Sequence, residues 1–267
     1  MTDRIKYFLP AAILLVIVLG GVVWYMMSVP APTPNFGTDT PTTPAEPVTV
    51  TDEATYYTVK ALYPSETPLK ASAGAQADQA AVSAMRTFVE QEIARFKDNG
   101  DFANLSHDDV QMLGLDQRKY ELGIEYQTYA GNATFSYVYQ MYMDTGGAHP
   151  NVFYRTFTFD SKTGAQLTMH DLFAENAPYL ETLSSLSRNK LPAFIAQRGG
   201  LSVSEVDTDY IASGTMPVED AFQNFYFRDG DLILLFPPYQ IGPYVLGMIE
   251  LPVPAITLPD LRPEYAK

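Results

Sequence analysis

The sequence predicts an α+β fold, in which an antiparallel sheet is packed with helices and is preceded by one transmembrane helix and a Pro/Thr-rich stalk. Three observations carry this prediction: a long uncharged apolar run near the N-terminus, several segments of alternating apolar residues, and segments with apolar residues three and four positions apart. Hydrophobic residues make up 46% of the 267 residues and aromatic residues 13%. This composition is typical of a folded, β-rich protein.

The predicted membrane anchor is the run 8–27, which has no charged side chain and is long enough to cross about 30 Å of hydrocarbon as a helix. Arg4 and Lys6 precede the run, and the first charge after it is Asp39. The positive-inside rule therefore places residues 1–7 in the cytoplasm and the rest of the chain outside it. A cleaved signal peptide is the alternative, but a proline directly after its cleavage site favours a retained anchor.

Charge and cysteine content limit the partners and the cell compartment. The formal net charge is -14, and because the first 27 residues contribute +1, the remainder carries -15. Nucleic acid is not an expected partner, since phosphate binding needs a basic face. The acidic charge would speed the encounter with a basic partner, or it serves solubility alone. The chain has no cysteine, and an extracytoplasmic domain without disulfides favours a bacterial cytoplasmic membrane.

Composition marks off the segment that follows the predicted anchor. The segment 28–47 is rich in proline, threonine and alanine, which predicts a disordered, extended stalk.

The first half of the exposed chain alternates strands with one long helix. β-branched and tyrosine residues predict a strand at 48–63, and a stripe of apolar residues predicts a helix at 75–97 that ends at Asn99-Gly100. Three further strands are expected at 119–129, 134–144 and 152–160, with Asn132 in the first turn. Short connections between them predict an antiparallel meander.

The second half begins with a tight turn at 160–164 and a helix at 178–198, closed by Gly199-Gly200. Pro192 is expected to kink or split this helix. Ser202 and Glu205 fit a capping box at the start of a short helix. Strands are then predicted at 224–228, 232–236 and 245–253.

Two loops are candidate ligand-binding sites. The first contains Thr145, Gly146, Gly147 and His149, where the glycines permit backbone angles that a side chain would forbid. Either Thr145 and His149 present donors to a ligand, or the glycines form a tight turn that His149 packs against or caps.

The second candidate loop is 237–244, in which Pro237, Pro238 and a further proline hold the aromatic residues Tyr239 and Tyr244. A stiff segment loses little entropy on binding, and tyrosine is a frequent interface anchor. The alternative is that the two tyrosines close one end of the hydrophobic core while the prolines route an irregular connection.

Catalysis is not expected. A hydrolase needs a nucleophile beside a base, and the candidates are Ser136, Ser161, His149, His170 and Asp171. No Gly-x-Ser-x-Gly pattern occurs, and the adjacent His170 and Asp171 fit a cap at the start of a helix better. The histidines lack the paired spacing of a zinc site, and acids are too numerous for any carboxylate pair to be informative. We expect no cofactor, and an uncharacterised hydrolase is the least favoured alternative.

Three stretches resemble the extracytoplasmic domain shared by RsiV-type anti-sigma factors, which sense lysozyme, and by some membrane-bound peptidoglycan deacetylases. They are 146–151 with the strand 157–160; Thr163-Gly164 with 167–173; and Phe225-Tyr226-Phe227 through the 236–244 segment to Gly247. Together these stretches place about 48–254 in the resemblance. It implies an N-terminal lobe at 48–131 and a C-terminal domain at 132–254, which leaves a tail at 255–267. The resemblance also implies a binding domain whose ligand is a lysozyme-like muramidase or peptidoglycan.

The resemblance has limits that narrow its meaning. Anti-sigma relatives carry a cytoplasmic sigma-binding segment, whereas only seven residues precede the apolar run here. Deacetylase relatives carry a metal-dependent catalytic domain for which no counterpart is recognised in this sequence. The expected function is therefore a membrane-anchored extracytoplasmic protein that binds or inhibits a lysozyme-like muramidase. A cell-wall or glycan-binding accessory module is the alternative.

Overall fold

The computed structural model describes residues 46–131 and 133–266. The predicted anchor at 8–27, nearly all of the predicted stalk at 28–47 and the predicted turn residue Asn132 lie outside the described residues. Within the described ranges, no helix is both long and apolar enough to span a membrane.

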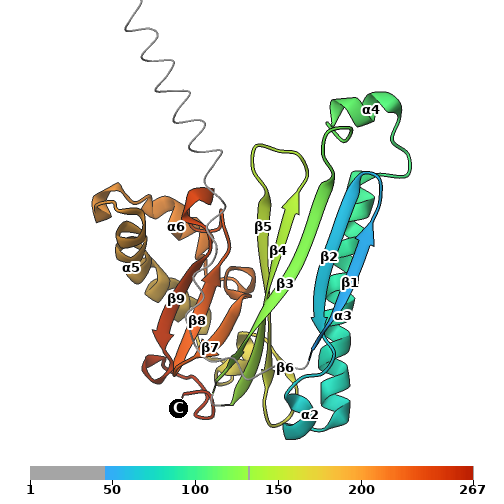
Figure 1. The fold of residues 1–267 in the computed structure, drawn as a ribbon. Helices are drawn as coiled ribbons and strands as arrows, with labels where there is room; N and C mark the ends of the chain where they lie inside the picture. The colour runs from blue at the N-terminus through green and yellow to red at the C-terminus, as the bar shows by residue number, and fades with distance from the viewer. Residues whose placement is uncertain (1–45, 132, 267) are drawn as a thin grey trace, which may run out of the picture. The chain divides into compact units, whose positions relative to one another are not determined.

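Six strands form one sheet in the order β1-β2-β3-β4-β5-β6 (Figure 1). They are β1 (Pro47–Glu53), β2 (Tyr57–Pro64), β3 (Tyr120–Ala130), β4 (Thr134–Asp144), β5 (Asn151–Asp160) and β6 (Gln166–Leu167). The α+β class is confirmed, but the prediction of a purely antiparallel sheet is wrong, because β2 and β3 run parallel. A connection that contains helices joins these two strands, and such a crossover allows neighbours to run parallel.

The predicted single strand at 48–63 is a hairpin. β1 and β2 pair along their whole length, from Pro47 opposite Pro64 to Glu53 opposite Thr58. The chain reverses at residues 54–56, where the N–H of Ala54 donates to the carbonyl of Tyr57 at 3.0 Å. Both arms are rich in β-branched residues and tyrosine, so their composition continues across the turn and conceals it.

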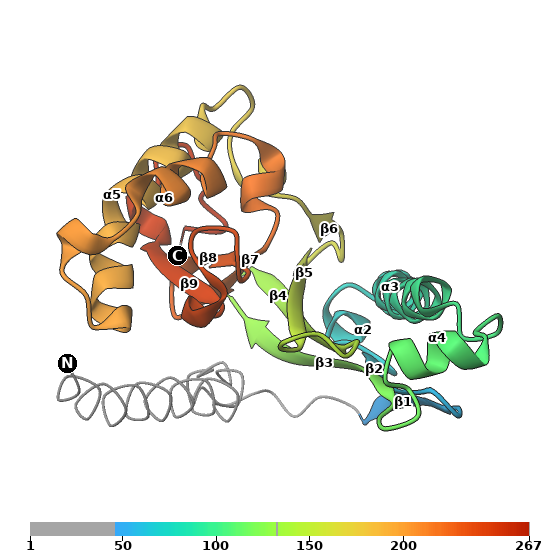
Figure 2. The same ribbon diagram turned by 90° about the horizontal axis from the view of Figure 1, so that it is seen from above.

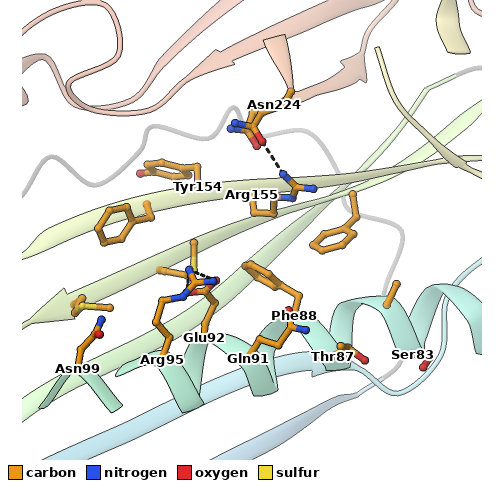
Figure 3. A pocket seen from close by; sticks show the side chains of 16 residues that line it. Ser83, Thr87, Phe88, Gln91, Glu92, Arg95, Asn99, Tyr154, Arg155 and Asn224 are labelled. Atoms are coloured by element: carbon orange, nitrogen blue, oxygen red, sulfur yellow. Dashed lines mark hydrogen bonds and ion pairs between the residues drawn. The ribbon is translucent and has the colours of Figure 1, made fainter. Parts of the chain in front are cut away.

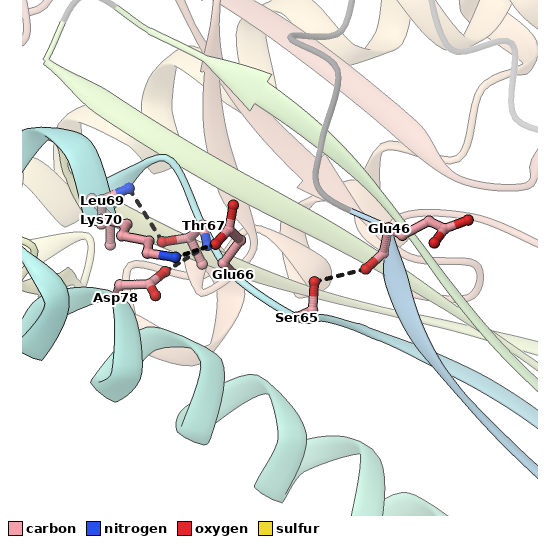
Figure 4. Close-up of polar contacts among 7 residues, drawn as sticks. All are labelled: Glu46, Ser65, Glu66, Thr67, Leu69, Lys70 and Asp78. Atoms are coloured by element: carbon pink, nitrogen blue, oxygen red, sulfur yellow. Dashed lines mark hydrogen bonds and ion pairs between the residues drawn. The ribbon is translucent and has the colours of Figure 1, made fainter.

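The helix α3 (Ala75–Gly100) packs on β2 and β3, between the short helices α2 (Leu69–Ser72) and α4 (His107–Met112). Met85, Val89 and Phe96 are buried on its inner face. The predicted helix at 75–97 is confirmed, and so is its end near Asn99-Gly100. The start of α3 is tied to the preceding segment, because Asp78 Oδ1 accepts a hydrogen bond from the N–H of Thr67 at 2.5 Å (Figure 4).

The predicted meander of β3, β4 and β5 is confirmed. The bounds of β4 agree with the prediction, and those of β3 and β5 differ from it by one residue. β3 pairs with β4 from Glu121 opposite Asp144 to Ala130 opposite Phe135. β3 and β4 are therefore neighbouring strands of one sheet.

A second sheet contains three antiparallel strands, β7 (Phe225–Arg228), β8 (Asp231–Phe236) and β9 (Ile249–Pro254). The helices α5 (Tyr179–Gly199) and α6 (Thr208–Gly214) lie against this sheet, whereas α3 and α4 lie beside the larger one (Figure 2). Buried residues such as Leu191, Ile211 and Leu234 share one core between these helices and strands. Neither α4 nor α6 was predicted from the sequence.

The predicted strand at 245–253 is wrong in its first part. Tyr244–Leu246 forms a turn of 3₁₀-helix, and β9 begins only at Ile249. Between them Gly247 has a φ of 64°, a left-handed conformation that breaks the extended chain.

The predicted helix at 178–198 is present as α5, and Pro192 does not split it. The helix ends at Gly200, whose φ is 64°, as expected for a glycine cap. The predicted capping box of Ser202 and Glu205 is confirmed, and it opens a single turn of 3₁₀-helix, Val203–Glu205.

The two sheets meet where β7 lies against β3, β4 and β5. The rings of Tyr129 on β3 and Tyr226 on β7 lie 4.3 Å apart at 30°. The buried Tyr226 hydroxyl donates to Glu250 Oε1 on β9 at 2.7 Å, and Glu250 also pairs with Arg228 at 3.3 Å. These contacts join β3 of the larger sheet to β7 and β9 of the three-stranded one.

Residues of the predicted tail complete the core beside the three-stranded sheet. Leu258, Leu261 and Tyr265 are buried. Phe173 forms an isolated antiparallel bridge with Leu261, and the Tyr265 hydroxyl donates to Asp160 Oδ2 at 3.1 Å. The segment after β9 therefore closes over the start of the helical half.

Candidate functional site

The structure brings the two predicted loops together. The loop between β4 and β5 carries His149, whose ring stacks on Tyr244 with centroids 4.1 Å apart and planes at 18°. The Tyr239 hydroxyl lies 3.3 Å from His149 Nε2, and the rings of Tyr239 and Tyr244 are 5.5 Å apart. We call these three residues the His149 cluster. Four strands of the two sheets lead into it, so its parts come from separate elements.

One backbone carbonyl fixes the orientation of two rings in the cluster. The oxygen of Pro150 lies 2.9 Å from His149 Nδ1 and accepts a hydrogen bond from the Tyr244 hydroxyl at 2.8 Å. Because a carbonyl can only accept, Nδ1 carries the proton, and in the neutral ring Nε2 accepts from Tyr239. The imidazole is thus held by three contacts.

The first loop depends on one of its two predicted glycines. Gly146 has a φ of 81°, and a Cβ there would lie 2.7 Å from Arg118 Nη2. Its N–H donates to Asp144 Oδ1 at 2.9 Å. Gly147 does not adopt a positive φ. Thr145 and Gly147 lie in the same loop, but among the described residues no hydrogen bond joins either to the cluster.

The second loop is anchored by Gln240. Its side-chain amide donates to the carbonyls of Gly214 at 2.9 Å and Ala221 at 2.8 Å. The N–H of Gln240 donates to Pro237 at 3.1 Å, which closes a turn around Pro238 and Tyr239. These bonds hold the proline-rich segment on the ends of α6 and of the turn before β7.

Tyr239 combines strain with exposure. Its φ of 69° places a bulky side chain in the left-handed region, where a non-glycine residue costs about 1–2 kcal/mol. The side chain is nevertheless 52% exposed. A strained conformation that presents an aromatic ring to solvent is a feature that clusters at functional sites.

The neighbouring phenols are held in the neutral form. Burial raises the pKa of Tyr244, and the charges that Tyr239 and Tyr142 would carry if ionised raise it further. Burial also raises the pKa of Tyr154, which is hydrogen-bonded to Gln140 Oε1 at 3.2 Å. Within the cluster, Tyr244 therefore offers a neutral hydroxyl and a ring face, which suit hydrogen bonding and stacking.

Two of the candidate hydrolase residues lie close together, because His170 Nδ1 is 4.0 Å from Asp171 Oδ1. Ser136 is fully buried and its hydroxyl bonds to that of Thr158 at 3.0 Å. Asp171 Oδ2 accepts hydrogen bonds from the N–H of Thr168 at 2.8 Å and from its hydroxyl at 2.7 Å. Asp171 lies in a single turn of 3₁₀-helix, His170–Leu172, whose N-cap residue makes no side-chain cap hydrogen bond. Among the described residues, no histidine ring is hydrogen-bonded to a serine or threonine hydroxyl. Within these same ranges no group of three or more metal-ligating side chains is arranged for an ion.

A groove of about 740 Å³ lies between α3 and β5 (Figure 3). Its apolar lining includes Phe88, Met141, Phe153 and Phe157, and Arg155 reaches across its edge. None of these residues was predicted to bind a ligand. Phe153, an aromatic residue in a predicted strand, was the feature of the sequence that could have indicated the groove, and its side chain is 46% exposed in the structure. Alternation of apolar residues alone does not identify which face of a strand is covered.

Comparisons with known proteins find two characterised relatives and a family of unknown function. It is 25% identical to peptidoglycan-N-acetylmuramic acid deacetylase PdaC of Bacillus subtilis over 183 residues, which is 68% of this chain and 36% of the deacetylase. It is 27% identical to an esterase of Mycobacterium tuberculosis over 129 residues, which is 48% of this chain and 52% of the esterase. The chain thus spans about a third of the first relative and half of the second.

Solved structures show the same fold. A crystal structure of a DUF3298 family member from Bacteroides fragilis matches with a TM-score of 0.52 and 18% identity, over 81% of this chain and 92% of that chain. A DUF3298 family protein from Pseudomonas aeruginosa matches with a TM-score of 0.52 and 13% identity, over 82% and 94%. The sequence pattern of the family, described as a protein of unknown function, matches residues 170–255. Residues 170–255 therefore match the DUF3298 domain, and together with the similarity to PdaC this match confirms the predicted resemblance to a domain found in peptidoglycan deacetylases.

Proposed function

We propose that this chain is a membrane-anchored extracytoplasmic protein of the bacterial envelope that uses the His149 cluster to bind a lysozyme-like muramidase. The observation that carries the proposal is the stacking of His149 on Tyr244 beside the exposed ring of Tyr239. Aromatic side chains that are already fixed lose little conformational entropy when a partner covers them. Such residues are frequent anchors of protein interfaces.

Charge supports this choice of partner. Lysozymes of the animal type are strongly basic, whereas the chain beyond residue 27 carries -15. Opposite net charges accelerate encounter and make the association rate sensitive to salt. Binding at the active-site cleft of a muramidase would also inhibit it.

A cell-wall glycan is the second candidate ligand. The exposed ring of Tyr239 offers a flat face of the kind on which sugar rings stack, and Tyr244 and His149 supply hydrogen-bonding groups beside it. The relative PdaC is named for a peptidoglycan sugar. In this case the module would hold the chain on the cell wall.

Titration calorimetry with the full-length chain in detergent separates these candidates. A basic lysozyme is one titrant and soluble peptidoglycan fragments are the other, each at low and high salt. We expect lysozyme to bind, more tightly at low salt, and Tyr239→Ala and His149→Ala to weaken it by about tenfold, which is 1.4 kcal/mol. Arg86→Ala, on the exposed face of α3, is the control and should bind normally.

Two results would count against the proposal. Absence of lysozyme binding at low salt would eliminate the muramidase, and tight binding of fragments would then establish the glycan. Equal losses in Tyr239→Ala and Arg86→Ala would show that the His149 cluster is not the binding surface.

A further inference from the structure

The groove between α3 and β5 is lined by none of the three residues of the His149 cluster. Its wall on α3 carries Phe88 and polar residues such as Gln91 and Asn99, and its opposite wall carries residues of β5 (Figure 3). Met141 and Phe157 are buried at its base. A cavity of this kind accepts apolar side chains while polar groups remain at the rim.

β5 has an unpaired edge along this groove. β6 pairs with β5 only at Thr158 and Phe159, so within the described residues no strand follows β5 between 151 and 157. Alternate residues of an antiparallel strand direct their N–H and C=O away from the partner strand. Thr156 belongs to the outward set, because its N–H bonds to the Asn224 side chain instead of β4.

The same alternation assigns Val152 and Tyr154 to the outward set. Their backbone groups point toward the side on which a further strand would lie. Phe153 and Arg155 occupy one face of β5 and Tyr154 the other, yet all three line the groove. A cavity that touches both faces of a strand runs along its edge, so the groove and the free backbone groups face the same space.

Charge adds a third feature. Arg95 is paired with Glu92 at 3.0 Å. Arg155 donates to the neutral Gln223 at 2.8 Å, and no carboxylate in the described part of the chain lies within ion-pair distance of it. In a strongly acidic protein, one uncompensated arginine at the rim of an apolar groove favours a ligand that brings its own carboxylate.

We propose that the groove binds an extended acidic peptide, which adds to the sheet as a strand beside β5. Main-chain hydrogen bonds to Val152 and Tyr154 supply affinity, as in other cases of strand addition. Alternate side chains enter the groove, with an apolar one against Phe153 and a Glu or Asp against Arg155. This inference concerns a different surface from the His149 cluster and does not depend on it.

The peptide acetyl-TVTETVT-amide tests the proposal with the full-length chain. Its valines and glutamate lie on one face of a strand, so they can occupy the groove together. NMR hydrogen exchange should show new protection of the Val152 and Tyr154 amides on binding. The Phe153 and Arg155 amides already face β4 and should change little, which makes them internal controls.

Variants of the protein separate backbone from side-chain recognition. Val152→Pro removes an outward N–H, which an edge position tolerates, and should weaken binding about tenfold or more, or 1.4 kcal/mol. Val152→Thr keeps the N–H and is the matched control, which should bind within about twofold. Arg155→Glu should weaken the glutamate peptide and strengthen a peptide with lysine in its place.

The peptide itself provides the decisive control. The same sequence N-methylated at every residue keeps the side chains but donates no main-chain hydrogen bond, and it should not bind. Binding of the methylated peptide with equal affinity would overturn strand addition. Failure of the unmethylated peptide to bind, or a charge reversal at Arg155 without effect on peptide preference, would overturn the proposal as well.

Discussion

The N–H of Thr156 donates to the side-chain oxygen of Asn224 at 3.1 Å, and the next residue, Phe225, returns a hydrogen bond to the Thr156 hydroxyl at 3.0 Å. Thr156 lies in the six-stranded sheet and Phe225 begins the three-stranded one. Both Thr156 and Asn224 are buried. This reciprocal pair therefore joins two sheets whose strands do not otherwise form one ladder.

Asn224→Ala should destabilise the domain by about 1–3 kcal/mol, because it leaves the buried N–H of Thr156 without a partner. Urea unfolding followed by circular dichroism measures the change. Gln223→Ala is the neighbouring control, since Gln223 is exposed, and it should stay within about 0.5 kcal/mol. Equal stability of Asn224→Ala and the wild type would show that the bond contributes nothing.

Tyr239→Gly should raise the free energy of unfolding by up to about 1 kcal/mol, although it removes one aromatic ring of the His149 cluster. Glycine adopts the φ of 69° found there without the strain that tyrosine bears. Tyr239→Ala also loses the ring but keeps a Cβ, so it should gain less. Thermal unfolding of the two variants measures the difference, and a more stable Ala than Gly variant would contradict a strained backbone at this position.

Gly214→Ala should displace the second loop. A Cβ at this position would lie 1.8 Å from the carbonyl oxygen of Gln240, so that part of the backbone has to move. We expect changed NMR shifts of the His149 ring, which stacks on Tyr244 in the same loop. Gly123→Ala is the control, because its nearest neighbour would be Tyr142 Cβ at 3.8 Å, and it should leave the His149 shifts unchanged.

Protonation of Asp160 in acid should lower the free energy of unfolding. Burial alone would raise the pKa of Asp160, but hydrogen bonds from Thr163, Tyr265 and Lys162 outweigh burial and lower the pKa below 3.8. Because the folded state favours the ionised form, this stabilisation is complete well above pH 3.8 and is lost as pH falls through the lower, folded-state pKa.

Asp160→Asn tests this dependence. Urea unfolding of the wild type and the variant is measured from pH 6 downward. The wild type should have the larger free energy of unfolding near neutrality, and the difference between the two proteins should narrow below about pH 4 as Asp160 is protonated. A difference that stays constant over the whole range would show that ionisation of Asp160 does not contribute.

Strands with strict alternation of residues could be predicted from the sequence, but which strands pair, and in which direction, could not. Tyr137, Tyr139 and Met141 alternate along β4, and the bounds of that strand agree with the prediction. The parallel pairing of β2 with β3 depends on how α3 packs, which local pattern does not encode. Val245 and Leu246 resemble strand residues, yet Gly247 and the preceding proline place them in a turn.

The two candidate loops could be found because glycine, proline and aromatic residues are concentrated in them. Their contact could not, since His149 and Tyr244 meet only when both sheets have assembled. The left-handed conformation of Tyr239 could not be predicted either, because tyrosine has no preference for it. The groove at β5 depends on which strand edge remains unpaired, and that is a property of the whole sheet.

The bridge between Phe173 and Leu261 has a consequence for biosynthesis. A chain is made from its N-terminus, and domains generally fold in that order. The strands up to residue 167 can assemble early, whereas the core around Leu172 and Phe173 stays open to solvent until Leu258, Leu261 and Tyr265 have been synthesised. An unfinished chain would therefore expose apolar surface that chaperones and proteases recognise.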